Sequence, residues 1–219
     1  MSQPTNMFSV CMMVVLLAFV KASGHNDTNV CNVTTILTQE NFDINQYLGK
    51  WYEVKWFPPF THAPSDIWSD YQTTYEMSNT GNFTVTIRAR ETPANKTCLV
   101  IKNTLYTSDT PGKLMEGTRH QWVIKTDYTS YALVYTCAEF FPNMTCMAHD
   151  SKVCSRTTSL PQETLTMLDG VMQSVLCISL AEHVDTPQDK SCDVKTSKGT
   201  LPAASLAALM FFLILTRLF

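Results

Sequence analysis

Apolar and polar residues alternate along the middle of the chain, from Lys50 to about residue 156. Alternation with a period of two is typical of β-strands that bury one face. Turn signals separate the alternating runs, most clearly at residues 78–81 and 109–112, where Gly, Asn and Pro supply the backbone angles of a reversal. The pattern predicts eight strands, over residues 50–57, 69–78, 82–91, 97–107, 113–117, 120–126, 130–138 and about 145–156.

A helical period replaces the alternation after residue 158. Ser159, Pro161 and Gln162 together are typical of a helix start. Gly170 weakens the following helix by up to about 1 kcal/mol relative to Ala, so packing of its apolar stripe must hold it. Eight strands without an intervening helix predict an all-β, antiparallel sandwich or barrel with one flanking helix. The stripe of this helix consists of Leu165, Leu168, Met172, Val175 and Leu176.

The first residues of the chain differ from the alternating middle. Met7–Phe19 is an apolar run, and small residues at Ala22 and Ser23 follow it. This arrangement is typical of a secretory signal peptide, which we predict over residues 1–22. An uncleaved anchor is the alternative, but the run is short for a membrane span.

The end of the chain carries a second apolar segment, Leu201–Phe219. Small residues and a short polar spacer precede it, which is the pattern of a glycosylphosphatidylinositol (GPI) attachment signal. We predict attachment at Ser197 and removal of residues 198–219, with Asp193 and Gly199 as alternative attachment residues. The competing interpretation is a membrane helix.

The composition points to a secreted glycoprotein. Eight cysteines in 219 residues fit an oxidising compartment. A net charge of −3 without a cluster of Lys and Arg argues against a nucleic-acid partner. Five Asn-x-Ser/Thr sequons predict a heavily glycosylated surface. These sequons lie at Asn26, Asn32, Asn82, Asn95 and Asn143.

The sequons also indicate which face of a strand is buried, because a glycan must point outward. Alternation from Asn82 then assigns the inward residues of the strand that follows it. The inward residues of this strand are Phe83, Val85, Ile87 and Ala89. On the strand that follows the sequon at Asn95, the residues predicted to face inward are Leu99, Ile101 and Leu105.

Residues that carry catalysis are scattered or missing. The five His residues show no paired spacing on one element, so the sequence predicts no metal site. It contains neither a Gly-rich phosphate loop nor a nucleophile elbow. We therefore predict no cofactor and no enzymatic activity.

Three separated motifs resemble the lipocalin family, in particular its branch of apolipoprotein D and the GPI-anchored insect lipocalin Lazarillo. The motifs are Gly49-x-Trp51-Tyr52-Glu53, Thr126-Asp127-Tyr128 followed by Tyr131-Ala-Leu-Val-Tyr135-x-Cys137, and Arg156 before Leu160-Pro161-Gln162-Glu163-Thr164. The resemblance implies an eight-stranded, up-and-down antiparallel barrel with one C-terminal flanking helix over residues 23–197. It also implies that Arg156 stacks over Trp51 at the closed end, a cation–π latch. Gly49, Trp51, Asp127 and Arg156 are then structural residues.

The resemblance further implies two disulfides, Cys31 with Cys137 and Cys98 with Cys192. The second departs from apolipoprotein D, whose cysteine at the start of the second strand is replaced near Asp70. The remaining thiols outside the signal peptide are odd in number, so one is free or joins another chain. These thiols are Cys146, Cys154 and Cys177.

The family binds small apolar molecules in the open mouth of the barrel, and eight strands leave room for one such ligand. Tyr75 matches a pocket tyrosine of the apolipoprotein D type, and alternation adds Tyr71 and Met77. Ordinary barrel packing is the alternative role for every candidate. The predicted ligand-binding residues are Tyr71, Tyr75, Met77, Phe83, Val85, Leu99, Ile101, Trp122 and Leu133.

The sequence leaves three functions open. The first is an extracellular, membrane-anchored carrier of a lipid, retinoid, steroid or bilin, which transports or sequesters it or protects lipid from oxidation. The second is a cell-surface recognition protein of the Lazarillo type, acting in neuronal guidance, whose loop from Pro58 to Trp68 faces a protein partner. The third is an enzyme like those of one lipocalin branch, in which Cys146 or Cys154 would be a nucleophile of low pKa facing the cavity.

Overall fold

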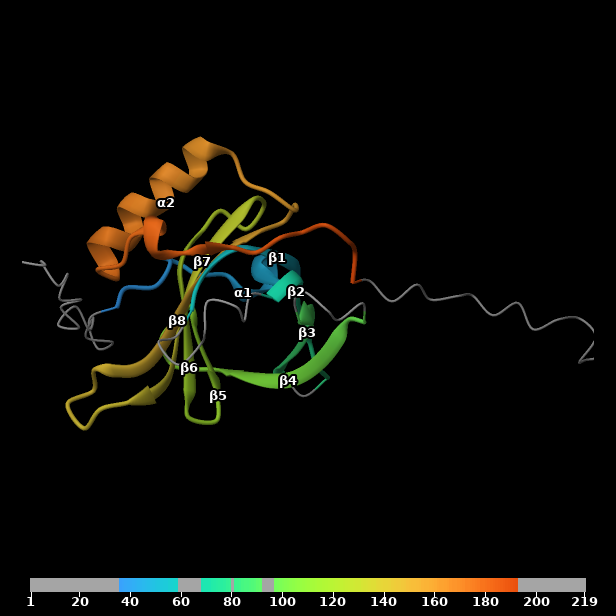
Figure 1. Ribbon diagram of the computed structural model, residues 1–219. Helices are drawn as coiled ribbons and strands as arrows, with labels where there is room; N and C mark the ends of the chain where they lie inside the picture. Colours follow the sequence, from blue (N-terminus) through green and yellow to red (C-terminus); the bar gives the residue numbers. More distant parts are fainter. Residues whose placement is uncertain (1–35, 59–67, 80, 92–96, 193–219) are drawn as a thin grey trace, which may run out of the picture.

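Nine strands and one long helix make up most of the part of the chain that the structure describes (Figure 1). The structure is a computed structural model that describes residues 36–58, 68–79, 81–91 and 97–192. The strands are β1 (Gly49–Phe57), β2 (Trp68–Met77), β3 (Phe83–Glu91), β4 (Leu99–Thr107), β5 (Lys113–Glu116), β6 (Arg119–Thr126), β7 (Tyr131–Phe140), β8 (Cys146–Ser155) and β9 (Val184–Asp185). The long helix is α2 (Gln162–Val175).

Antiparallel pairing closes the sheet into a barrel. Strands β2 to β8 pair in chain order, and β1 pairs with both β2 and β8. The predicted eight-stranded, up-and-down antiparallel barrel is therefore confirmed, with strand bounds that differ from the prediction by a few residues. Three short elements were not predicted from the sequence: the helix α1 (Ile44–Tyr47), the 3₁₀ turn η2 (Leu180–Glu182) and β9. Elements this short do not complete enough periods to be recognised from a pattern.

The closed end of the barrel is fastened by Arg156. Its guanidinium lies 3.6 Å from the centroid of the Trp51 ring. It also donates hydrogen bonds to the backbone carbonyls of Tyr128 (2.9 Å) and Lys50 (2.8 Å). Gly49 has a φ of +95°, and a Cβ there would lie 3.3 Å from the guanidinium, so a larger residue is strained. This geometry matches the latch that the family resemblance implies.

Asp127, the other motif residue, holds the turn between β6 and β7. Its Oδ1 accepts hydrogen bonds from the backbone N–H groups of Thr129, Ser130 and Tyr131, at 3.1, 2.8 and 2.9 Å. Partial burial raises the pKa of Asp127, but these bonds and the Ser130 hydroxyl outweigh it and lower the pKa overall. The ionised carboxylate thus stabilises the turn.

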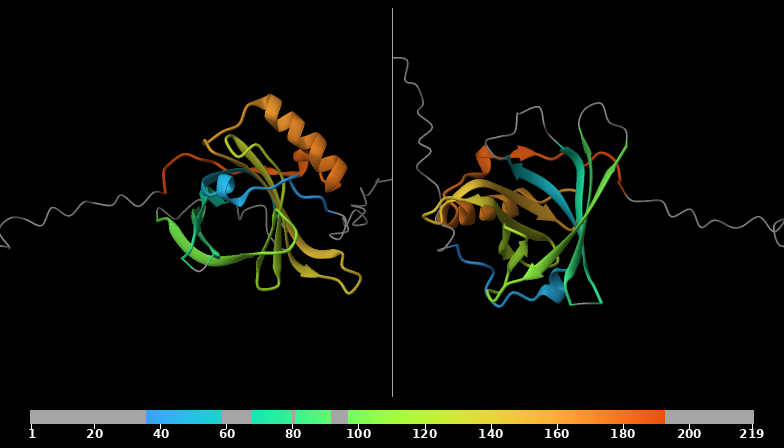
Figure 2. Two further views of the ribbon diagram at one scale, coloured as in Figure 1. Left: turned by 180° about the vertical axis from the view of Figure 1, so that it is seen from behind. Right: turned by 90° about the horizontal axis from the view of Figure 1, so that it is seen from below.

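Helix α2 packs on the outer face of the barrel (Figure 2). Leu168 and Met172 are fully buried there, against Trp122 of β6 and Leu133 of β7. The predicted helix and its docked stripe are confirmed. It begins at Gln162, with Pro161 rather than Ser159 as the N-cap and without a side-chain cap. Packing on the sheet therefore carries the stability of the helix, as Gly170 in its middle requires.

We predict that Leu168→Ala lowers the free energy of unfolding by about 3 kcal/mol, because it leaves a cavity between α2 and the sheet. Met167→Ala, at a neighbouring side chain that is 38% exposed, is the control and costs no more than about 0.5 kcal/mol. Urea unfolding followed by circular dichroism measures both. Equal losses in the two variants would show that α2 is not docked through Leu168.

Candidate ligand-binding site

Two cavities lie inside the barrel, and together we call them the calyx. The inner cavity, of about 100 Å³, is the one that reaches Tyr75 and Cys154 towards the closed end. The outer cavity, of about 280 Å³, is bordered by Trp56 and Trp68. The two cavities are contiguous because they share the side chains of Tyr71, Ile87, Asn103, Arg119 and Lys152.

A buried ion pair lies where the two cavities meet. The Nζ of Lys152 on β8 is 3.2 Å from Oε2 of Glu53 on β1. The same Nζ donates a 3.1 Å hydrogen bond to the Tyr71 hydroxyl and lies 4.4 Å from that ring's centroid. Burial raises the pKa of Glu53, and the charge of Lys152 opposes the rise. Burial lowers the pKa of Lys152, but Tyr71 and Glu53 outweigh it, so Lys152 remains protonated.

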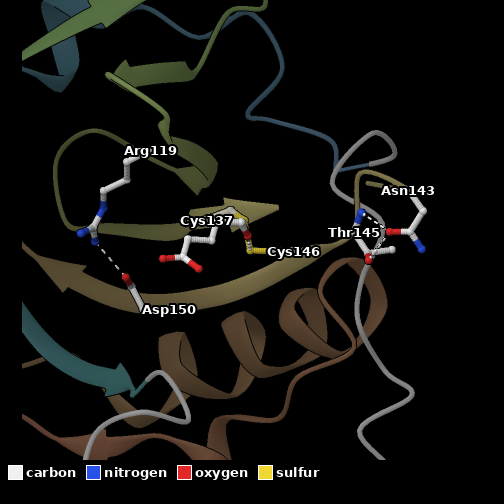
Figure 3. The surroundings of a disulfide bond; sticks show 7 residues. Arg119, Cys137, Asn143, Thr145, Cys146 and Asp150 are labelled. Carbon is white, nitrogen blue, oxygen red and sulfur yellow. Dashed lines mark hydrogen bonds and ion pairs between the residues drawn. A yellow bond between two sulfur atoms is a disulfide. The ribbon is translucent and has the colours of Figure 1, made fainter. Parts of the chain in front are cut away.

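A second ion pair lies on the calyx wall, between Arg119 at the start of β6 and Asp150 on β8. The guanidinium of Arg119 is 2.9 Å from Oδ2 of Asp150. A dashed line marks this ion pair in Figure 3. The Arg119 side chain is 45% exposed, whereas that of Asp150 is 11% exposed. With Glu116, the calyx is bordered by three carboxylates and two cations. Its wall therefore offers polar partners to a ligand.

The remaining lining is part apolar and part polar. Val85, Ile87, Leu105 and Val134 offer hydrocarbon surface to the inner cavity. Gln121 lines the same cavity and donates a 3.1 Å hydrogen bond to the Tyr75 hydroxyl. Burial, as the main cause, raises the pKa of Tyr75 to about 12, so its phenol stays neutral. The arrangement can hold a mainly apolar molecule that carries a polar group.

The calyx thiol is not suited to nucleophilic catalysis. Cys154 is buried, and burial, with added repulsion from Glu53, raises the pKa of its thiol to about 12. Cys146 is bonded to Cys137. Attack requires a thiolate, which needs a lowered pKa and access. The disulfide contradicts the enzymatic alternative for Cys146, and the burial and raised pKa of Cys154 count against it there.

The structure brings several of the predicted ligand-binding residues to the calyx. Tyr71, Tyr75 and Val85 line the inner cavity, and Ile101 lines the outer one. Whether they contact a ligand remains a prediction. Phe83, Met77 and Leu99 line neither cavity. Phe83 is buried in the aromatic cluster around Trp51, Met77 is 44% exposed at the end of β2, and Leu99 begins β4.

Trp122 and Leu133 were assigned to the wrong face of the sheet. Both pack against α2 outside the barrel, in the cluster that contains Leu168. Their neighbours Val123 and Val134 belong instead to the interior cluster. The physical reason is that this part of the sheet is apolar on both faces, since the helix covers one of them. Alternation alone cannot then tell inside from outside.

The charged and polar calyx residues were not predicted, because the period-2 pattern identifies an inward face by its apolar residues. Lys152, Arg119 and Asp150 are the clearest cases. A signal for them did exist. Glu53 lies two positions after Trp51, on the same inward face, and a carboxylate buried there requires a cation on a neighbouring strand.

The disulfides agree with one implied pairing and contradict the other. Cys98 is bonded to Cys192, as the family resemblance implies. Cys137 is bonded to Cys146 and not to Cys31, which lies outside the described residues. The hairpin of β7 and β8 explains the correction, because it brings these two cysteines to a Cα separation of 5.8 Å (Figure 3). Among the described cysteines, Cys154 and Cys177 are free, and Cys177 is exposed.

Only two of the five predicted glycosylation sites, Asn82 and Asn143, lie among the described residues. Asn143 is exposed, and its Oδ1 accepts hydrogen bonds from the backbone and hydroxyl of Thr145, the third residue of the sequon. Asn82, beside β3, is half-buried. The described residues contain no group of three metal-binding side chains and no helix long and apolar enough to span a membrane. The remaining predictions fall outside the described residues: Asn26, Asn32, Asn95, Ser197, residues 1–22 and residues 59–67.

A closed antiparallel barrel with an internal calyx and one flanking helix defines a class of proteins that enclose small ligands. Residues 68–189 match the family model described as "Lipocalin / cytosolic fatty-acid binding protein family". The chain belongs to the lipocalin family. It lies close to apolipoprotein D within that family.

Individual relatives agree with this assignment. Apolipoprotein D of Mus musculus is 30% identical over 180 residues, which cover 77% of this chain and 89% of the relative. Apolipoprotein D of Bos taurus is 31% identical over 168 residues, which cover 68% and 82%. Retinol-binding protein 4 of Gallus gallus is 28% identical over 167 residues, 69% of this chain and 82% of the relative. The crystal structure of the cockroach allergen Per a 4 shares the fold, with a TM-score of 0.57, 19% identity and coverage of 73% and 95%.

We predict that Lys152→Met lowers the free energy of unfolding at pH 7 by about 3 kcal/mol, because it leaves the Glu53 carboxylate buried without its cation. In this variant the folded-state pKa of Glu53 lies further above its unfolded value. The folded protein then binds more protons, so its stability falls as pH rises through the window between the two pKa values and recovers on acidification.

The control is the double variant Glu53→Gln/Lys152→Met, which removes both charges. It should recover part of the lost stability and show a smaller pH dependence between pH 4 and 7. Urea unfolding across that pH range measures both effects. A double variant no more stable at pH 7 than Lys152→Met would contradict the buried pair.

Proposed function

We propose that the protein is an extracellular, membrane-anchored lipocalin that binds a small hydrophobic ligand in the calyx. The observation that carries the proposal is the pair of contiguous cavities inside the barrel, bordered by Ile87, Tyr71 and Lys152. The names of the relatives apolipoprotein D and retinol-binding protein 4 support a lipid or a retinoid as the ligand. A steroid or a bilin stays a candidate through the family resemblance alone.

The lining supports one orientation of such a ligand. Its apolar part would lie along Val85, Leu105 and Val134, where burial gains about 25 cal/mol per Å² of apolar surface. A polar group would lie beside the ion pairs of Lys152 and Arg119, because a group that displaces water there must replace its hydrogen bonds. Enclosure of an unsaturated ligand would also protect it from oxidation.

Secretion and anchoring are supported by the chain itself. The predicted signal peptide and sequons fit passage through the secretory pathway, and the two disulfides of the structure fit an oxidising compartment. The apolar segment Leu201–Phe219 and the small residues before it support a GPI anchor at Ser197.

The alternative is a cell-surface recognition protein of the Lazarillo type, for which the barrel is a scaffold. Exposed apolar side chains on β4 favour it: Val100 is 49% exposed and Tyr106 is 47% exposed. Side chains of this kind on a surface strand can contact a partner protein. The two functions are compatible, because the calyx and this surface are separate.

We predict that native mass spectrometry of the protein secreted from eukaryotic cells detects one bound small apolar molecule. Ile87→Trp should lower its occupancy at least tenfold, because the indole fills the junction of the two cavities. Val100→Trp, on the adjacent strand but exposed, is the control and should keep the ligand.

The opposite result is also informative. A wild-type protein that is empty, and that takes up no member of a panel of fatty acids, retinoids, steroids and bilins, would overturn the carrier function. The exposed residues of β4 would then become the first site to test for a protein partner.

We predict that phosphatidylinositol-specific phospholipase C releases the protein from the surface of cells that express the full chain. Flow cytometry before and after treatment measures the release. A matched protein fused to an authentic membrane helix is the control and stays bound. Retention of this protein after treatment would favour the membrane helix over the GPI anchor.

A further inference from the structure

Strands β1 and β2 form a fork in the barrel wall. They pair only near the closed end, where Gly49–Tyr52 faces Gln72–Tyr75. Beyond this point β1 continues to Phe57 without a partner in β2. Glu53 and Tyr71 stand at the base of the fork, and both also border the outer cavity. An unfilled fork would therefore open the calyx sideways.

The C-terminal segment fills the fork. Strand β9 pairs with β1 at Lys55 and Trp56, away from the closed end. Figure 2 shows the orange-red segment beside the cyan β1. The residues that follow, 186–192, we call the strap. The backbone N–H of Thr186 donates to the carbonyl of Val54 (3.1 Å), and that of Asp70 on β2 donates to the carbonyl of Pro187 (2.7 Å). The strap thus bonds to both arms of the fork.

One strap side chain bridges the two arms directly. Nε2 of Gln188 donates to the backbone carbonyl of Glu53 at 2.7 Å and to that of Tyr71 at 3.1 Å. These carbonyls belong to neighbouring strands that no longer pair with each other. Gln188 therefore supplies the cross-strand hydrogen bonds that the diverging sheet lacks.

A second strap side chain holds a calyx carboxylate. The hydroxyl of Thr186 donates a buried 2.8 Å hydrogen bond to Oε1 of Glu53, whose Oε2 forms the ion pair with Lys152. The two carboxylate oxygens thus face one strap residue and one barrel residue. Thr186 fixes the orientation of Glu53 and hence the position of the charge that borders the ligand space.

The far end of the strap is fastened to the barrel as well. The Asp70 carboxylate accepts the backbone N–H of Lys190 at 2.6 Å and is ion-paired with Arg90 at 2.7 Å. Cys192 is bonded to Cys98. The strap is therefore held at both ends, by Thr186 at its start and by Cys192 at its end, with Gln188 between them.

We propose that the strap is part of the ligand site: Gln188 closes a side entrance between β1 and β2, and Thr186 positions Glu53. The two residues act through the barrel and are positioning residues for the ligand. The proposal rests on ligand binding in the calyx for its functional meaning, but the closure itself is a property of the wall. Loosening the strap should speed exchange with the calyx without unfolding the barrel.

The buried thiol of Cys154 is a reporter of that closure, because it lines the inner cavity and its backbone pairs with Glu53. In the mature full-length protein, we expect Gln188→Met to raise the rate at which N-ethylmaleimide labels Cys154 at least tenfold. Peptide mass spectrometry reads Cys154 separately from the exposed Cys177. Gln188→Met keeps the length of the side chain and removes the amide. Thr186→Val, which removes only a hydroxyl, is the second variant and should raise the rate several-fold.

Leu168→Ala controls for global unfolding, because it weakens the docking of α2 far from the fork. Labelling of Cys154 should rise more in Gln188→Met than in Leu168→Ala, even if Leu168→Ala loses more global stability in urea. If Cys154 is labelled no faster in Gln188→Met and Thr186→Val than in Leu168→Ala, the proposal is overturned, because the strap would then not close the wall.

The second readout uses all-trans-retinol as an apolar probe. Its binding and dissociation are measured by the quenching of tryptophan fluorescence. Trp56 and Trp68 border the outer cavity. We expect Gln188→Met to raise the retinol dissociation rate at least fivefold, with a smaller change in the equilibrium constant. A wild-type protein that binds no retinol would count against the carrier function. The labelling of Cys154 would still test whether the strap closes the wall. An unchanged dissociation rate, with retinol bound, would refute the role of the strap in ligand exchange.

Discussion

Strand β1 is the element on which the rest of the structure depends, because its pairing along both edges turns an open sheet into a barrel. One edge pairs with β8. The other is divided between β2 near the closed end and β9 near the mouth. Arg156, which directly follows β8, bonds to the carbonyl of Lys50 in β1 and lies over Trp51, so the latch acts on this strand as well. The calyx exists because these contacts leave no open sheet edge at β1.

The same closure forces ionic groups into the interior. Glu53 belongs to β1 and must face inward with Trp51, and Lys152 of β8 neutralises it. A buried pair of this kind seldom adds net stability, since desolvation offsets the attraction. For the ligand site that we propose, we infer that the consequence of the pair is selectivity. A wholly apolar molecule would remove water from the charges without replacing its hydrogen bonds, whereas a ligand with one polar group can meet them.

The sequence predicted the barrel and its helix well, because alternation and helical period are local and each strand is long enough to show them. It placed Tyr71, Tyr75 and Val85 correctly on the inner wall. The prediction failed for residues whose position depends on parts of the chain that are distant in sequence. Trp122 and Leu133 face a helix that lies far along the chain, and the inward charge of Lys152 has meaning only beside Glu53. The Cys137–Cys146 bond likewise depends on the length of a hairpin and not on a motif.

The covalent path through the C-terminal segment bears on how an anchored form would behave. The proposed attachment residue, Ser197, follows Cys192 closely in the chain, so a membrane anchor would pull on Cys192 first. The disulfide transfers that load to Cys98, next to the start of β4, because a covalent bond resists extension far better than the hydrogen bonds of the strap. Gln188 and Thr186 lie on the other side of this bond and are shielded from the load. The proposed anchor and the proposed closure of the calyx would therefore be compatible in one short segment, because the Cys98–Cys192 bond lies between them.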